Sequence, residues 1–319
     1  MNCICRPLLV VLVGPTGVGK SDWAIALAQR WGCEIISADS RQVYRQIPIG
    51  TAAPSALDLA AVPHHFIGTR DVWEPYSAAD YESDVMELLP RLFSRNPIQI
   101  LCGGSMMYVD AVCHGIDDLP PISSLVRNEL WQRFEAKGVE PLAEELGRVD
   151  PCYLERIDRR NHKRIIHALE VYYSSGRPYT SFHTHTHRLR SFDCLKICLQ
   201  TNREVLYDRI NNRVDRMLEL GLLEEAESMY SRRQLNALNT VGYKELFAYF
   251  DGLVSLPQAV DLIKRNSRRY ARKQLTWWRH APKVHAIDLE IGHEALIHRI
   301  ESLVDQVSPY KYRLEDESV

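Results

Sequence analysis

The strongest chemical signal in the sequence is a glycine-rich segment that follows the apolar run Leu8 to Val13. It reads Gly14-Pro15-Thr16-Gly17-Val18-Gly19-Lys20-Ser21. In this pattern the glycines let backbone N–H groups converge on phosphate oxygens, the lysine adds a positive charge, and the serine can ligate Mg²⁺. The alternative is a glycine-rich turn with a surface lysine. Between an expected strand and an expected helix, the full motif predicts a phosphate-binding loop, which is typical of ATP- and other nucleotide-binding proteins.

Two more polar turns follow expected strands. Asp39 comes directly after the apolar run 34–38, and Ser105 follows the run 98–102 and two glycines. Because the carboxyl ends of parallel strands meet at one edge of a sheet, we expect both side chains near the phosphate loop. Asp39 could organise Mg²⁺ through water or accept a proton from a nucleophile. The alternative for both residues is a helix cap.

The elements that must position these residues alternate along the chain. Short runs rich in Val and Ile predict buried strands over residues 8–13, 34–38, 65–68, 98–102, 195–200 and 284–289. Apolar residues at helical spacing predict helices over 21–31, 77–94, 123–137, 163–174, 202–220, 224–231, 241–250 and 256–279. The alternation predicts an α/β fold with a parallel sheet that helices cover on both faces.

The strand signal is interrupted after Cys102. We therefore expect a phosphate-loop core in two parts, 1–114 and 193–319, the second carrying basic C-terminal helices, and an inserted, mainly helical domain over 115–192. Three alternating histidines lie in the insertion, namely His183, His185 and His187. No Cys or carboxylate spacing completes a metal site there, so we interpret them as a polar segment.

The composition of the 319 residues is that of an ordinary globular protein, with 45% hydrophobic and 25% charged residues. It excludes collagen-like and disordered chains. No run approaches the ~18 to 20 apolar residues of a membrane span, and nothing marks the chain for export. Eight irregularly spaced cysteines indicate reduced thiols. We therefore expect a cytoplasmic protein without a membrane partner.

The net charge of −2 hides one strongly basic segment. Seven basic residues fall within 16 positions that contain no acidic residue, namely Lys264, Arg265, Arg268, Arg269, Arg272, Lys273 and Arg279. On a helix, Arg265, Arg268 or Arg269, Arg272 and Arg279 could form one stripe, with Tyr270, Trp277 and Trp278 nearby. Such a face suits a polyanion such as RNA. The alternative is a solvated basic face with aromatic core anchors.

In their order, these motifs resemble the tRNA dimethylallyltransferase family from about Leu8 to Arg279. Besides the phosphate loop, the resemblance rests on Asp39-Ser40-Arg41-Gln42-Val43-Tyr44, Ile49-Gly50-Thr51-Ala52, Tyr76-Ser77-Ala78-Ala79-Asp80, Gly103-Gly104-Ser105, Ala168-Leu169-Glu170-Val171, Val241-Gly242-Tyr243-Lys244-Glu245 and Arg269-Tyr270-Ala271-Arg272-Lys273-Gln274-Leu275-Thr276-Trp277. Several motifs in order are far more specific than any one of them.

The resemblance implies a P-loop NTPase-like core and a Mg²⁺-dependent prenyltransferase. Such an enzyme transfers a dimethylallyl group from dimethylallyl diphosphate to the N6 amine of the adenosine 3′ to the anticodon, position 37, in tRNA. The phosphate loop would hold the diphosphate, with Mg²⁺ on Ser21. Asp39 corresponds to the general base, and Arg213, four residues before Met217, to an arginine that stabilises the leaving diphosphate. Ser105 replaces a usual threonine and keeps its hydroxyl as a catalytic group.

The resemblance also implies a set of tRNA-binding residues, namely Asp39, Ser40, Arg41, Gln42, Ser105, Arg127, Lys163, Arg164, His167, Arg269, Arg272 and Lys273. We expect Gln42 to place its amide against the base edge. Four positions depart from the family pattern: Ala53 stands in place of lysine, and His162, Lys163 and His167 in place of Asp, Gln and Arg. The alternatives are a small-molecule kinase that uses ATP and a non-catalytic RNA-binding protein. We expect a monomer in each case.

Overall fold

The computed structural model describes residues 6–183 and 188–308. Internal contacts divide the chain into two compact units. The core unit combines Met1–His114 with Leu189–Val319, and the inserted unit is Gly115–Arg188. The insertion thus begins at the expected position, whereas its end lies at Arg188 and not at 192.

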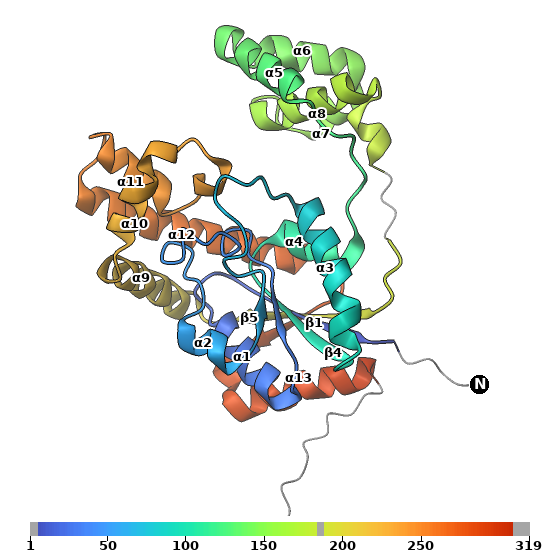
Figure 1. Ribbon diagram of the computed structural model, residues 1–319, viewed down its shortest axis with the longest axis vertical. Coiled ribbons are helices and arrows are strands. Elements are labelled where there is room, and N and C mark those ends of the chain that lie inside the picture. Colours follow the sequence, from blue (N-terminus) through green and yellow to red (C-terminus); the bar gives the residue numbers. More distant parts are fainter. Residues whose placement is uncertain (1–5, 184–187, 309–319) are drawn as a thin grey trace, which may run out of the picture. The chain divides into compact units, whose positions relative to one another are not determined.

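A six-stranded sheet forms the centre of the core unit (Figure 1). Its strands are β1 (Leu8–Val13), β2 (Ile35–Ser37), β3 (His64–His65), β4 (Ile98–Cys102), β5 (Asp193–Gln200) and β6 (Val284–Asp288), in the order β3-β2-β4-β1-β5-β6. All neighbouring strands are parallel, which confirms the expected α/β fold. The strand expected over 65–68 is wrong beyond His65, because Phe66 adopts a left-handed φ of 64° that ends the extended run.

The helices of the core unit are α1 (Lys20–Trp31), α2 (Ala56–Ala61), α3 (Ala78–Phe93), α4 (Met106–His114), α9 (Arg203–Glu219), α10 (Leu222–Met229), α11 (Tyr243–Phe250), α12 (Leu256–His280) and α13 (His293–Val307). Short 3₁₀ turns lie at Tyr230–Arg232, Asn236–Leu238 and Leu289–Ile291. Ser77 and Ser255 begin α3 and α12 with capping boxes, so both helices start where the sequence indicates. Within the described residues, no helix has the length and apolar character needed to span a bilayer.

Helices cover both faces of the sheet, as expected. On β1, Leu8, Val10 and Leu12 face the side covered by α1, α9 and α13. Leu9, Val11 and Val13 face α3 and α4. All six side chains are at most 1% exposed, and each such burial stabilises the fold by about 1.5 to 3 kcal/mol. This packing fixes the carboxyl end of β1, from which the phosphate loop leaves.

A third apolar cluster supports the segment that follows Asp39. Val43, Tyr44 and Ile47 pack with residues of α9, α10 and α11, and with Ala259 and Ile263 of α12. Farther along, α12 contributes to the two sheet cores as well. One long helix therefore contacts every part of the core unit that bears on the candidate site.

The inserted unit is a small helical bundle. It consists of α5 (Ser124–Lys137), α6 (Glu140–Val149), α7 (Pro151–Arg156), α8 (His162–Ser175) and a 3₁₀ turn, Tyr179–Phe182. Its own apolar core includes Leu130, Leu146, Ile165 and Leu169. Arg188 at its end pairs with Asp118 near its beginning. The unit therefore has the core needed to hold its surface residues in place.

Candidate active site

The phosphate loop connects β1 to α1 through three glycines with positive φ. These are Gly14 (146°), Gly17 (80°) and Gly19 (99°), a backbone region that other residues rarely adopt. A Cβ atom on Gly14 would lie 2.6 Å from the carbonyl oxygen of Leu199 in β5. The loop thus needs glycine both for its turn and for its close approach to the neighbouring strand, and it opens at the carboxyl edge of the sheet.

Lys20 folds over this loop. Its Nζ donates to the carbonyl oxygens of Gly14 and Pro15, each at 3.0 Å. The pKa of Lys20 is lowered to about 8, chiefly by burial and with a smaller contribution from the charge of Arg213, while Cys102 and Asp39 oppose the shift. At pH 7 the ammonium form still predominates, by about ten to one. A positive charge is therefore held where a phosphate would compete with the two carbonyl groups.

Helix α9 brings two arginines to the same loop. Arg213 Nη1 donates to Thr16 Oγ1 at 3.3 Å, and Arg209 Nη1 donates to the carbonyl oxygen of Val18 at 3.1 Å. Burial lowers the pKa of Arg213, against the charges of Asp39 and Asp22, but an arginine stays protonated at neutral pH. The structure thus places Arg213 at the phosphate loop. It adds Arg209, which nothing in the sequence distinguishes from a solvated helical arginine.

Asp39 lies at the carboxyl end of β2 in a half-buried position. Its Oδ1 accepts from the N–H groups of Arg41 at 2.9 Å and Gln42 at 3.3 Å. Within 6–183 and 188–308, its Oδ2 has no hydrogen-bond partner. The carboxylate also raises the pKa of Lys20 and of Arg213 against the larger effect of burial. Asp39 therefore caps the turn that contains Ser40 and Arg41 and at the same time faces the charges of the phosphate loop.

The Gln42 amide is engaged by protein groups. Its Nε2 donates to the carbonyl oxygens of Thr51 at 3.2 Å and Ala52 at 3.0 Å, and its Oε1 accepts from the Ser37 hydroxyl at 3.3 Å. In this structure Gln42 orders the 49–52 turn, because its amide spans the gap between β2 and that turn. The expected contact with a base edge would require these bonds to be exchanged.

Helix α10 supports the same 49–52 turn. The Glu225 carboxylate of α10 accepts from the N–H groups of Ile49 and Gly50, both at 2.8 Å, and from the Tyr243 hydroxyl at 2.5 Å. Burial and the nearby Glu225 charge raise the pKa of Tyr243, which keeps its proton for this bond. Ala53, the residue in place of the usual lysine, donates its N–H to Pro48 and adds no charge. Glu225 gives no sequence signal, since it looks like any glutamate of an amphipathic helix.

The second glycine turn packs directly on Ala38, which follows β2 and precedes Asp39. Ser105 N–H donates to the carbonyl oxygen of Ala38 at 3.0 Å, and a Cβ atom on Gly103 would lie 2.2 Å from that oxygen. Ser105 is 9% exposed and precedes α4. The Tyr270 hydroxyl of α12 donates to the carbonyl oxygen of Gly104 at 3.4 Å. Asp39, Ser105 and Lys20 thus belong to three adjacent turns at one sheet edge, as the sequence indicates.

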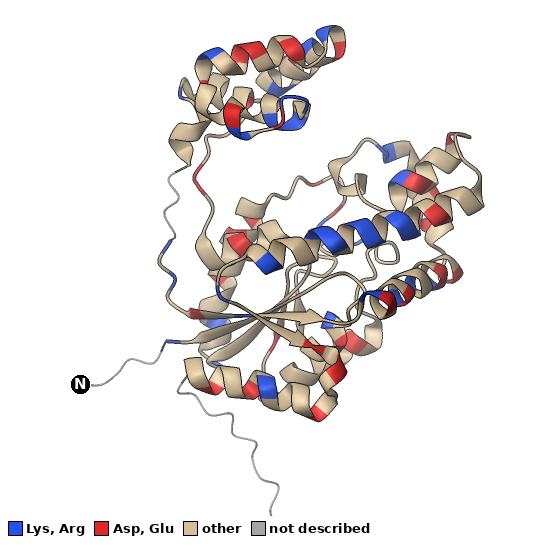
Figure 2. Ribbon diagram, turned by 180° about the vertical axis from the view of Figure 1, so that it is seen from behind, with Lys and Arg blue, Asp and Glu red and all other residues tan. Residues whose placement is uncertain are grey.

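The basic residues of α12 occupy the face opposite its buried side. Arg265, Arg269, Arg272, Lys273 and Arg279 are exposed, and Figure 2 shows this succession of basic residues along the helix. The expectation that Trp278 lies beside this stripe is wrong, because the indole is 2% exposed and packs in the core against α3 and α4. Tyr270 and Trp277 keep 39% and 42% of their surface exposed.

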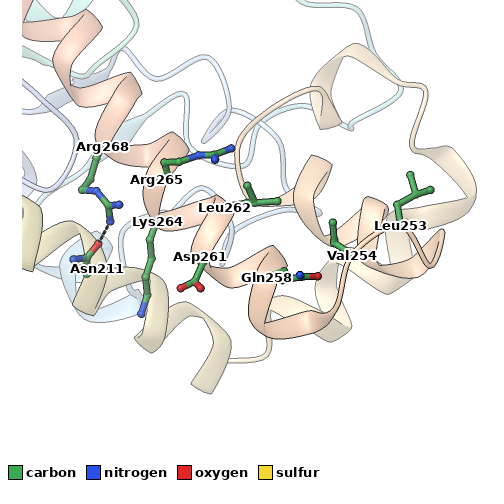
Figure 3. Close-up of a pocket in the computed structure, with 9 residues that line it drawn as sticks. All are labelled: Asn211, Leu253, Val254, Gln258, Asp261, Leu262, Lys264, Arg265 and Arg268. Carbon is green, nitrogen blue, oxygen red and sulfur yellow. Dashed lines mark hydrogen bonds between the residues drawn. The ribbon is translucent and has the colours of Figure 1, made fainter.

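A groove of about 690 Å³ lies beside the first half of α12. Figure 3 shows Asn211 of α9 facing Arg268 of α12, and the two are 2.6 Å apart. At its edge, Lys264 pairs with Asp215 of α9 at 2.6 Å. None of the phosphate-loop residues lines this groove. Its polar contacts anchor α12 to the helix that carries Arg213.

In the inserted unit, the expected tRNA-binding residues lie on α5 and on the first half of α8. Lys163 and Arg164 are exposed in its first turn. His167 and Arg127 both contact the buried Glu170 carboxylate, at 3.4 and 2.9 Å. Burial opposes ionisation of Glu170, but these two hydrogen bonds prevail and lower its pKa. Arg127 is thus held by an ion pair and His167 by a hydrogen bond to the same carboxylate, whereas Lys163 and Arg164 are presented to solvent.

His162 departs from the family pattern in a way that the packing explains. Its ring stacks on Phe134 with centroids 4.5 Å apart and an angle of 11°, and it meets Trp131 edge-on. It therefore joins the aromatic side of the bundle. Of the three alternating histidines, His185 and His187 lie outside the described residues.

The described part of the chain has no group of three or more His, Cys, Asp or Glu side chains placed to hold a metal ion. Ser21 is exposed in the first turn of α1, next to the phosphate loop. Mg²⁺ commonly binds through one or two protein oxygens, substrate phosphates and water. The Ser21 hydroxyl therefore fits an ion that arrives with a diphosphate, and does not fit an ion held by protein alone.

Comparisons with known proteins agree with this arrangement. Residues 42–281 match the family model described as IPP transferase. The chain is 51% identical over 278 residues to tRNA dimethylallyltransferase 1 of Bacteroides thetaiotaomicron, which covers 87% of this chain and 90% of the relative.

Solved structures of related proteins are also similar. The tRNA isopentenylpyrophosphate transferase of Bacillus halodurans is 38% identical with a TM-score of 0.69, over 94% of this chain and 96% of that one. A eukaryotic dimethylallyltransferase acting on tRNA is 25% identical with a TM-score of 0.78, over 97% and 81%. With three turns of the expected chemistry at one sheet edge and this extent of similarity, the chain belongs to the IPP transferase family.

Proposed function

We propose that this protein transfers a dimethylallyl group from dimethylallyl diphosphate to the N6 amine of adenosine 37 in tRNA. The observation that carries the proposal is that Lys20, Arg213 and Asp39 lie together at one sheet edge. Helix α12, which contacts the turns at this edge, has an exposed basic face. The names of the relatives and their coverage of the chain support the same activity. We further propose that it acts in the cytoplasm as a monomer.

The phosphate loop prepares the leaving group. When the allylic C–O bond breaks, negative charge develops on the diphosphate and positive charge on the allyl carbon. The Lys20 ammonium, the Arg213 guanidinium and the loop N–H groups stabilise the first of these charges. Lys20 and Arg213 are half-buried and already oriented by their hydrogen bonds, so little reorganisation opposes bond cleavage. A bound Mg²⁺, held by the Ser21 hydroxyl and the diphosphate oxygens, would supply further neutralisation of the leaving group.

Asp39 accepts the proton that the N6 amine of adenine must lose. The N6 amine of adenine is a poor nucleophile, which becomes acidic only as its bond to the allyl carbon forms. Because Oδ1 is held by two backbone N–H groups, the orientation of the carboxylate is fixed and Oδ2 is left to accept this proton. The same contact orients the amine before attack.

The target adenine must leave its stack to reach this edge, as in other enzymes that modify a base. Recognition then depends on phosphate charge and on exposed bases. On the core unit, Arg269, Arg272 and Lys273 offer positive charge beside the half-exposed Tyr270 and Trp277. The inserted unit offers Lys163 and Arg164. We propose that these groups bind the anticodon stem-loop.

A product assay tests the proposed function. Purified protein and Mg²⁺ are incubated with unmodified tRNA and either dimethylallyl diphosphate or ATP, and the digested nucleosides are weighed. The expected result is an adenosine heavier by one prenyl unit, found only with the prenyl donor. An ATP-dependent product would favour a kinase. Unmodified adenosine in a tRNA that the protein demonstrably binds would favour an RNA-binding protein without this activity.

The affinity for dimethylallyl diphosphate should fall as the pH rises through about 8. Above the lowered pKa of Lys20, the loop loses its ammonium charge, and the expected decrease approaches about tenfold per pH unit. Titration calorimetry between pH 7 and pH 10 measures it, with Lys20→Arg as the control that keeps its charge. An equal pH dependence in both proteins would assign the titration to another group.

The same lowered pKa has the opposite sign for stability. The unfolded chain holds the Lys20 proton up to about 10.5, whereas the folded chain releases it at about 8. Between these values the unfolded state binds more protons, so the contribution of Lys20 to the free energy of unfolding rises with pH. A weaker affinity for the diphosphate above pH 8 therefore cannot result from destabilisation of the fold by Lys20.

A further inference from the structure

We propose that Gln274 couples tRNA binding on α12 to diphosphate binding at the phosphate loop. The inference deepens the proposed function and rests on it, since it concerns how the two substrates affect each other at that site. Gln274 appears in the sequence only as one residue of a longer motif. Tyr270 of α12 also donates to the Gly104 carbonyl oxygen, but Gln274 is bonded both to Gly104 and to the phosphate loop.

Both ends of the Gln274 amide are used. Its Oε1 accepts from the Thr16 N–H of the phosphate loop at 2.8 Å, and its Nε2 donates to the carbonyl oxygen of Gly104 at 2.9 Å. The side chain is 1% exposed. An amide carries an acceptor and a donor on one planar group, so it can join these two turns, whereas an ionised carboxylate or a thioether cannot. Gln274 therefore sets the spacing between two of the three turns at the site.

Thr16 is the point at which this contact reaches the diphosphate site. Its backbone N–H is bound to Gln274, and its hydroxyl accepts from Arg213 of α9 at 3.3 Å. A residue held from two helices transmits a small shift of either helix to the loop. Lys20 is close as well, because a Cβ atom on Gly104 would lie 3.9 Å from its Nζ and 2.4 Å from the Gln274 amide nitrogen.

The other end of the coupling is the basic face of the same helix. Arg272 and Lys273 are exposed directly before Gln274 in the chain. The first half of α12 is anchored to α9 by the contacts of Lys264 and Arg268 (Figure 3). RNA phosphates that bind the exposed side chains therefore act on the helix whose buried side carries the hydrogen bond from Gln274 to Thr16. A bound diphosphate that orders the loop favours the same position of α12, because coupling between two sites is reciprocal.

A thermodynamic cycle tests the proposal. Calorimetry measures the Kd of Mg²⁺-pyrophosphate with and without unmodified tRNA, and the Kd of the tRNA with and without pyrophosphate. In the unaltered protein each ligand is expected to tighten the other by the same factor, about fivefold or more. Gln274→Met fills the same space without the two bonds. It should bind each ligand alone with at most modest loss and reduce the coupling factor to about one.

A buried glutamine elsewhere supplies the matched control. Gln99 is also 1% exposed, and its amide bonds to Glu34 N–H at 3.1 Å, Leu92 O at 3.1 Å and Asn96 O at 2.9 Å, away from the three turns. Gln99→Met should lose comparable stability and keep the coupling. Gln274→Glu is a second test, since it keeps the acceptor for Thr16 but sets a carboxylate oxygen against the Gly104 carbonyl, and it should also lose coupling.

The outcomes separate the inference from the proposed function. An unchanged coupling factor in Gln274→Met or Gln274→Glu, or an equal loss in Gln99→Met, would overturn the role of Gln274. Absence of coupling in the unaltered protein, with both ligands bound, would overturn it as well while leaving the prenyl transfer intact. Failure of the unaltered protein to bind pyrophosphate at all would instead overturn the proposed function, and this inference with it.

Discussion

Replacing Asp39 by Asn is expected to lower kcat for prenyl transfer by about 10² to 10⁴-fold, the usual contribution of a general base. The amide oxygen can still accept from the N–H groups of Arg41 and Gln42, so the turn is retained. The amide cannot take the proton of the N6 amine. Single-turnover measurements with saturating tRNA and dimethylallyl diphosphate report the chemical step, and a separate binding assay should show nearly unchanged tRNA affinity.

The Asp39→Ala variant shows how much the hydrogen bonds of Asp39 to its turn contribute. It removes the base and both turn hydrogen bonds, so it should be as slow as the Asn variant and additionally bind tRNA less tightly. The two variants together separate proton transfer from local structure. An Asn variant as active as the unaltered protein would remove Asp39 from the chemistry and leave it as a cap.

Replacing Lys20 by Met should lower kcat/KM for dimethylallyl diphosphate by about 10² to 10³-fold, as loss of a preorganised charge does elsewhere. The methionine keeps most of the side-chain volume, so the loop can keep its path between β1 and α1. The loss should appear in both KM and kcat, because the ammonium faces the diphosphate before and during departure. Steady-state kinetics with the donor varied measures it.

Lys20→Arg and tRNA binding are the controls for this variant. The arginine keeps the charge but not the compact geometry that reaches the carbonyl oxygens of Gly14 and Pro15, so partial activity is expected. The tRNA affinity of Lys20→Met measured without donor should be close to that of the unaltered protein. If Lys20→Met instead kept kcat/KM, the loop would not bind the diphosphate.

The strands were predictable where the chain is apolar and ends at a glycine. The expected bounds of β1 and β4 are those observed, because all their side chains are buried and Gly14 and Gly103 follow them. The short β3 is different. His64 and His65 are half-buried and polar, and the left-handed Phe66 ends the strand through a backbone conformation that residue type does not reveal.

Helices with caps and regular spacing were also predictable, with ends within two residues. The sequence did not single out α2, α6, α7 or α13. In α13, Leu296, Ile300, Leu303 and Val304 recur at helical spacing, so the signal was present. Helix α7 spans six residues, too few for a period to be recognised. Helix α2 buries none of its residues, so it carries no apolar stripe to find.

Some residues of the candidate site could be predicted from the sequence and others could not. Asp39 and Lys20 were recognisable because each stands at a fixed place relative to a strand end or a glycine turn, and Arg213 was recognisable only through the family resemblance, four residues before Met217. Gln274 and Glu225 were not, since both act by bridging segments that are distant in the chain. An amide on a basic helix looks solvated until the fold buries it. Long-range contacts of this kind depend on the packing of α10 and α12, which composition does not encode.

The insertion after α4 has a consequence for synthesis of the chain. Strand β1 pairs with β4 on one side and with β5 on the other, and β5 begins only at Asp193. At 5 to 20 residues per second, the ribosome needs roughly 5 to 20 seconds to pass from the end of β4 to the end of β5. During that interval β1, Leu8–Val13, is the open edge of an incomplete sheet, and all six of its residues are apolar. Such an edge invites pairing with other chains, so the nascent protein is most prone to aggregate while its inserted unit is being made.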